Sequence, residues 1–137
     1  MGFQIRRLQE EGIGLIVGTG HMTGQELVTA CVELVKSPAW RPGDTEVWDL
    51  STAAQVDVSP EQLDRLVGSA HEYAERIGEG RCVFITRRDG VDALLRLFGR
   101  LTRDLDREYH IARTREDASR WLGLDAGALD ELAEAGA

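Results

Sequence analysis

The sequence has few cysteines and no cysteine-based metal motif. The two that occur, Cys31 and Cys82, lie inside apolar segments, one with helical and one with strand-like periodicity. Buried thiols are typical of a reducing compartment rather than of a disulfide framework, and the CxxC or Cys–His spacing of a zinc site is not found. We therefore predict a cytoplasmic protein with no disulfide, no metal and no cofactor.

Positive charge is also scarce. The 137 residues include 16 Lys and Arg against 24 Asp and Glu, so the formal net charge is −8. Proteins bind a phosphate backbone through Lys and Arg that displace condensed counterions, and no concentrated basic face is visible here. Several arginines recur at near-helical spacing, but interspersed acidic residues indicate a solvated helix face: Arg96, Arg100, Arg103 and Arg107. Nucleic acid is therefore not an expected partner.

Long apolar runs are absent as well. A membrane-spanning helix needs roughly 18 or more consecutive apolar residues, and the longest runs here are far shorter. Residues 1–7 also lack the apolar core of a signal peptide. We expect no membrane span, which agrees with a cytoplasmic location.

No complete catalytic motif is found. Residues 18–24 join a strand to a helix, where a phosphate-binding loop would lie, but their spacing is G-x-G-x-x-x-G instead of G-x-G-x-x-G. The Walker motif is missing, and the histidines do not pair by spacing with a nucleophile or carboxylate: His21, His71 and His110. The chain is not expected to be an enzyme, although a nucleotide-binding enzyme that uses the loop from Gly18 to Gly24 stays open as an alternative.

The residues that are present predict one α/β domain. Hydrophobic residues make up 42% of the chain and charged residues 29%, as in ordinary globular proteins. Residues 3–5 and 13–17 predict a β-hairpin, and helical and strand patterns then alternate, which indicates a largely parallel sheet. We predict a mixed, mostly parallel five-stranded sheet in the order β-β-α-β-α-β-α-β-α over residues 1–124, with a helical extension or tail over residues 125–137.

The clearest helix start is at Ser59. Pro60 suits the first helical position because an N–H there has no intrahelical partner, and Gln62 completes a capping box with Ser59. Helical spacing of apolar residues then continues to Ile77. Ser59 can be an ordinary cap, which contributes about 0.5–2 kcal/mol. A helix start also tolerates a phosphate, whose charge would repel an acidic partner or recruit a basic one.

Two short segments around this start, DLS at residues 49–51 and VDVS at residues 56–59, resemble the STAS domain signature of anti-sigma-factor antagonists. In that family a strand ends in Asp-Leu-Ser, and an apolar-Asp-Ser-Ser-Gly step opens the following helix. By this resemblance Ser59 falls on the residue that the family phosphorylates, and Asp57 falls on the acidic residue before it. Two residues depart from the pattern, where the family has serine and glycine: Val58 and Pro60.

Other segments look like the SpoIIAA-like (STAS/SEC14-type) group of small bacterial proteins. These are GHMTGQE at residues 20–26, LLRLF at residues 94–98 and REDASRWL at residues 115–122. The resemblance implies a STAS/SpoIIAA-like fold without enzymatic activity. It also implies a pocket or surface that holds an apolar small molecule or another protein.

The favoured hypothesis is a non-catalytic STAS-like binding or regulatory module. Its partner would be a protein, such as an anti-sigma factor or a kinase-like protein, or an apolar small molecule. A narrower alternative is an anti-sigma-factor antagonist switched by phosphorylation of Ser59, and a homodimer formed through an exposed tryptophan is a further possibility. The candidate regulatory or binding residues are Asp49, Ser51, Thr52, Asp57 and Ser59.

Overall fold

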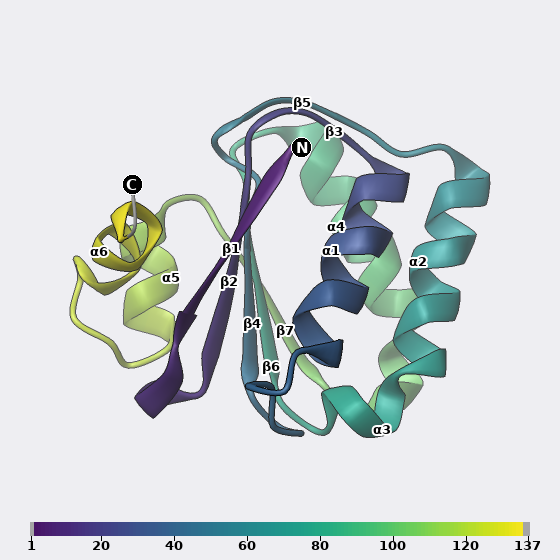
Figure 1. Cartoon of the computed structure of the whole chain (residues 1–137). Helices are drawn as coiled ribbons and strands as arrows, with labels where there is room; N and C mark the ends of the chain where they lie inside the picture. Colours follow the sequence, from purple (N-terminus) through teal and green to yellow (C-terminus); the bar gives the residue numbers. More distant parts are fainter. Residues whose placement is uncertain (1, 136–137) are drawn as a thin grey trace.

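A five-stranded sheet forms the centre of the computed structural model, which describes residues 2–135 (Figure 1). The strand order is β1-β2-β4-β6-β7, and only the β1–β2 pair is antiparallel. The short turn η1 (Gln9–Glu11) joins that pair and ends at Gly12, whose φ of 63° suits glycine. The strands are β1 (Phe3–Leu8), β2 (Ile13–Gly18), β4 (Thr45–Asp49), β6 (Arg81–Ile85) and β7 (Glu108–Ala112).

Helices cover both faces of this sheet (Figure 1). On one face lie α1 (Gly24–Lys36) and α4 (Asp89–Leu101), and on the other lie α5 (Arg115–Trp121) and α6 (Ala128–Glu134). Helix α2 (Pro60–Glu72) packs mainly against α1 and α4 and so lies farther from the sheet than they do. The one-turn helix α3 (Ala74–Ile77) and the short turn η2 (Arg103–Leu105) complete the chain's helical parts within residues 2–135.

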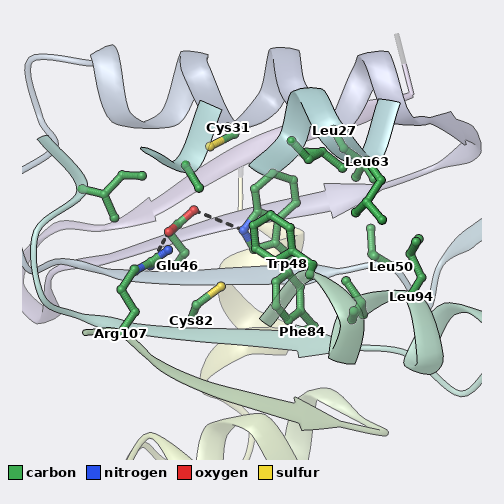
Figure 2. A pocket seen from close by; sticks show the side chains of 15 residues that line it. Leu27, Cys31, Glu46, Trp48, Leu50, Leu63, Cys82, Phe84, Leu94 and Arg107 are labelled. Atoms are coloured by element: carbon green, nitrogen blue, oxygen red, sulfur yellow. Dashed lines mark hydrogen bonds and ion pairs between the residues drawn. The ribbon is translucent and has the colours of Figure 1, made fainter. Parts of the chain in front are cut away.

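Alternation along the strands creates two hydrophobic cores. In β6, Cys82 and Phe84 belong to the core under α1 and α4, whereas Val83 and Ile85 belong to the core under α5 and α6. This is the behaviour expected of a uniformly apolar strand buried on both faces. Trp48 of β4 lies beside Phe84, with ring centroids 6.5 Å apart (Figure 2).

The structure confirms the predicted fold class and the mixed, mostly parallel five-stranded sheet. Two further strands were not predicted: β3 (Gly20–Thr23) and β5 (Ala53–Asp57) pair in parallel as a separate two-stranded ribbon. Both are short and mostly exposed, so they lack the apolar alternation that predicts a strand. The helix expected to run from Ser59 to Ile77 is interrupted at Tyr73, where α2 ends and α3 begins.

Helix α6 allows a test of how the end of the chain contributes to stability. Leu129 is fully buried in the second core, whereas Leu101 at the end of α4 is 45% exposed. Leu129→Ala should lower the free energy of unfolding by about 2–5 kcal/mol, because it removes buried methyl groups and leaves a cavity. Leu101→Ala, the matched control, should change it by less than about 0.5 kcal/mol. Equal midpoints for the two variants in urea unfolding would show that α6 is not part of the cooperative fold.

Candidate functional site

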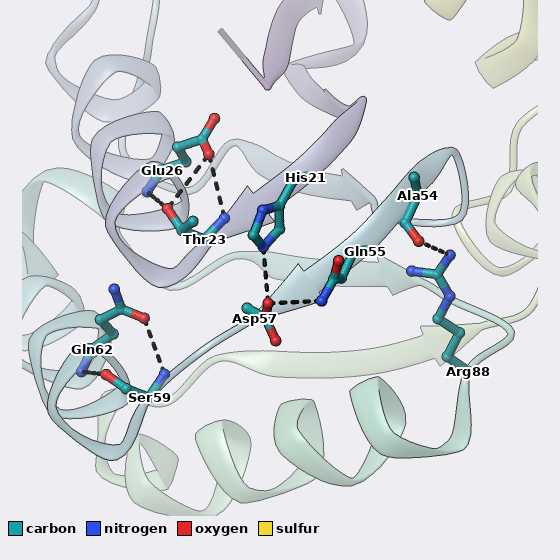
Figure 3. A network of polar contacts seen from close by, with 9 residues as sticks. All are labelled: His21, Thr23, Glu26, Ala54, Gln55, Asp57, Ser59, Gln62 and Arg88. Carbon is teal, nitrogen blue, oxygen red and sulfur yellow. Dashed lines mark hydrogen bonds and ion pairs between the residues drawn. The ribbon is translucent and has the colours of Figure 1, made fainter.

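The start of α2 is an exposed, fully capped helix terminus (Figure 3). The Ser59 hydroxyl accepts a hydrogen bond from the Gln62 backbone N–H at 3.2 Å, and the Gln62 side-chain oxygen accepts one from the Ser59 N–H at 3.0 Å. The predicted capping box is therefore confirmed. Because Ser59 is exposed, its hydroxyl is accessible to solvent as well as serving as a cap.

The two-stranded ribbon brings Asp57 and His21 together beside this helix start (Figure 3). One carboxylate oxygen of Asp57 lies 2.9 Å from His21 Nε2 and accepts a hydrogen bond from the Gln55 amide, also at 2.9 Å. The His21 and Asp57 side chains are 53% and 60% exposed. Among residues 2–135, neither of them is hydrogen-bonded to a serine, threonine or cysteine side chain, so the pair is not part of an assembled triad.

The start of α1 lies against the start of α2. Thr23 and Glu26 form a second capping box, and the Glu26 carboxylate also accepts a hydrogen bond from the Gly2 N–H at 2.8 Å. Gly24 is required here, because a Cβ on it would lie 2.4 Å from Cβ of Gln62 in α2. A phosphate at the start of α1 would therefore meet a carboxylate and a packed side chain, and this geometry favours a structural role for residues 18–24.

Asp49 is buried, and its carboxylate forms hydrogen bonds that stabilise the fold. Its carboxylate accepts hydrogen bonds from the Ser51 N–H at 2.9 Å, from the Ser51 hydroxyl at 2.5 Å and from Arg115 Nε at 2.5 Å. Burial disfavours the charged form of Arg115, but the bonds and charges of Asp49 and Asp130 outweigh it and raise the Arg115 pKa. Asp49 thereby connects the end of β4 to α5 on the other face of the sheet.

The remaining predicted residue, Thr52, is exposed in the loop between β4 and β5 and donates a hydrogen bond to the Gly18 carbonyl at 2.7 Å. The five predicted residues therefore form two groups. Asp57 and Ser59 lie at the ribbon and the start of α2, whereas Asp49, Ser51 and Thr52 order the loop that precedes the ribbon. Sequence reasoning did not connect His21 with Asp57, because their proximity depends on the unpredicted β3–β5 pairing.

A buried ion pair is a second feature that the sequence did not reveal. Arg107, predicted to belong to a solvated helix face, instead follows the helix and pairs with Glu46 of β4, and that prediction is wrong. The side chains of Arg107 and Glu46 are only 4% and 2% exposed.

The pair lies at one end of a cavity of about 50 Å³ between the sheet, α1, α2 and α4 (Figure 2). A space therefore remains between α2 and the sheet.

Two of the three tryptophans are too deeply buried to mediate the homodimer that an exposed tryptophan would allow. Trp40 and Trp48 are 1% and 5% exposed and belong to the first core. Trp121 is half-buried and stacks on His110, with ring centroids 4.7 Å apart.

Neither a metal-binding cluster nor a membrane-spanning helix is found in residues 2–135. Within residues 2–135 no cluster of three or more His, Cys, Asp or Glu side chains has the arrangement of a metal site. None of the helices described there is both long enough and apolar enough to cross a membrane.

Two solved structures are similar to the chain at low sequence identity. One is an uncharacterised protein of the DUF3478 family with a SpoIIAA-like fold from Shewanella loihica PV-4, at a TM-score of 0.58 and 16% identity over 88% of this chain and 91% of that one. The other is the anti-sigma factor antagonist SpoIIAA in its unphosphorylated form, at a TM-score of 0.55 and 12% identity over 88% of this chain and 97% of that one. No protein-family model and no curated protein sequence matches the chain.

These similarities cover most of the chain, and at this low sequence identity they show its fold. They agree with the strand order and with the helices on both faces of the sheet. The STAS-type resemblance of the sequence is confirmed at this level, and the chain has a SpoIIAA-like fold.

The capping geometry predicts how Ser59 variants differ in stability. Ser59→Ala removes the acceptor for the Gln62 N–H and should lower the free energy of unfolding by about 0.5–2 kcal/mol. Ser59→Asp keeps a capping oxygen, so its stability should stay close to that of the wild type. Urea unfolding of the three proteins measures this difference, and an alanine variant as stable as the wild type would contradict the capping role.

Proposed function

We propose that the chain is a non-catalytic regulatory module that binds a protein partner at the start of α2. The proposed recognition surface consists of His21, Gln55, Asp57 and Ser59. The observation that carries the proposal is the exposed Ser59 hydroxyl beside the exposed Asp57–His21 pair. These polar groups are held by two capped helices and a strand ribbon, so a partner would meet them already ordered.

Regulation by phosphorylation of Ser59 is the narrower form of this proposal. One of the structural neighbours is an anti-sigma factor antagonist, solved in its unphosphorylated form. At Ser59 of this chain the helix start favours a phosphate, whereas the nearby Asp57 carboxylate would make the modified surface strongly acidic. Such a surface would repel an acidic partner that binds the unmodified protein.

The other sequence-based alternatives have unequal support. Free, buried Cys31 and Cys82 agree with a reducing, cytoplasmic setting. The nucleotide-binding alternative at residues 18–24 has little support, because Glu26 and Gln62 occupy the region where a phosphate would lie. An apolar small molecule remains a second candidate for binding, and the cavity beneath α2 favours it.

Partner binding is expected to depend on the charge at Ser59. A partner retained by the wild-type chain should bind Ser59→Asp at least about tenfold more weakly, because the substitution adds negative charge at the centre of the proposed surface. Arg120→Ala, on α5 across the sheet, is the control and should bind like the wild type. Affinity can be measured by calorimetry on a partner first captured from the native host. Equal affinity for all three proteins would place the interface elsewhere.

The phosphorylation switch has its own measurement. Intact-mass spectrometry of the protein from its native host, under several growth conditions, should detect a phosphorylated species that fragmentation assigns to Ser59. If every condition yields only unmodified protein, the switch is refuted, whereas the proposed recognition surface still depends on the binding experiment.

A further inference from the structure

An open groove of about 700 Å³ lies between α4 and β7, at the edge of the sheet. The apolar side chains that line it are Phe84, Leu95, Tyr109 and Ile111. On the α4 side, Gly99 contributes no side chain, and a Cβ there would lie 3.8 Å from the ring of Tyr109. The glycine therefore leaves space between the helix and the strand.

Strand β7 is an edge strand with open hydrogen-bonding groups. It pairs with β6 alone among the strands of residues 2–135, and on that side the Ala112 carbonyl accepts from the Thr86 N–H at 3.0 Å. Main-chain groups of successive residues point to opposite sides of a strand, so those of Tyr109 and Ile111 point away from β6. Edge strands are often protected by lysine, proline or a bulge, and β7 has none of these. Two N–H and two carbonyl groups are therefore available to a further strand.

The groove is positively charged although the chain as a whole is acidic. Three arginines line it, and no Asp or Glu of residues 2–135 does: Arg96, Arg100 and Arg103. Asp92 pairs with Arg96 at 2.5 Å, whereas Arg100 and Arg103 form no ion pair within those residues. Asp104 is engaged with His71 of α2 at 3.0 Å. Two exposed guanidinium groups are therefore available to an acidic ligand.

These features together determine the class of ligand. An extended peptide can form main-chain hydrogen bonds with an open strand edge, and acidic side chains on it can pair with arginine. A nucleic acid has no amide backbone that would pair with β7. A second copy of β7 is a poor occupant, because pairing of the two strands would bring two sets of three arginines together.

We propose that the groove between α4 and β7 binds an acidic, extended peptide segment of a partner protein, which adds a strand to the five-stranded sheet. The side chains of such a peptide alternate between the two faces of the sheet. Those on the α4 face would meet the arginines, so acidic residues fit there. Those on the other face would lie beside the stacked rings of His110 and Trp121, so apolar residues fit there. This surface is separate from the start of α2, so the two binding proposals are tested independently.

A heptapeptide of alternating glutamate and valine, longer than the five residues of β7, is the probe for the full chain. Calorimetry should show binding that weakens as salt is added, because exposed charges are screened. The matching peptide of lysine and valine should bind at least about tenfold more weakly. In hydrogen exchange, the glutamate peptide should slow the amides of Tyr109 and Ile111 at least about tenfold, while that of His110, which points toward β6, changes little.

Three results with these probes would overturn the proposal. They are no binding of the glutamate peptide, equal binding of the lysine peptide, and binding without slower exchange at Tyr109 and Ile111. A single-stranded oligonucleotide that binds as tightly as the glutamate peptide would also overturn it, because the groove would then be a general anion site.

Matched variants locate the binding site. Arg100→Glu should weaken binding of the glutamate peptide at least about tenfold, whereas Arg65→Glu, the same charge change on exposed α2, should not. Gly99→Leu fills the groove and should abolish binding, whereas Gly90→Leu, in the first turn of α4 with no atom near its Cβ, should bind like the wild type. Leucine favours a helix more than glycine does, so both leucine variants should fold. Unchanged binding by Arg100→Glu or by Gly99→Leu would contradict the site.

Discussion

The position of α2 on α1 and α4, rather than on the sheet, is the constraint on which both candidate sites depend. Because the inner face of α2 does not reach the strands closely, a space remains above Trp48 and Phe84. Because α2 begins at the surface, its cap Ser59 is exposed and lies near the β3–β5 ribbon. The contact of Gly24 with Gln62 keeps the starts of α1 and α2 together, so this surface is ordered from two sides.

Two ion pairs place the carboxylates of Asp49 and Glu46 in the interior of the molecule. Asp49 with Arg115 connects the sheet to α5, and both carboxylate oxygens are used by donors from Ser51 and Arg115. Glu46 with Arg107 connects β4 to the segment that precedes β7 and lies at one end of an apolar cavity. Buried charges cost solvation energy that complete pairing offsets.

The sequence predicted the parts of the fold that depend on local periodicity. Apolar spacing predicted α1 and α4, the capping boxes predicted the starts of α1 and α2, and the uniform apolar run at Cys82–Ile85 predicted a strand buried on both faces. It did not predict β3 and β5, because their pairing joins short, mostly polar segments far apart in the chain. Arg107 and Glu46 are separated by 61 residues, and no local pattern connects them. Sequence reasoning therefore offered Ser59 and Asp57 as candidates, whereas the proximity of His21 to Asp57 and the position of the cavity required the structure.

An experimental structure of the protein isolated from its native host tests the central claim most directly. That claim is that α2 bridges α1 and α4, which exposes its own start and leaves a space over the sheet. The account predicts an exposed Ser59 bonded to the Gln62 N–H, and an open space between α2 and the side chains of Trp48 and Phe84. A structure in which α2 packs directly on Trp48 and Phe84, with the space closed, would contradict it.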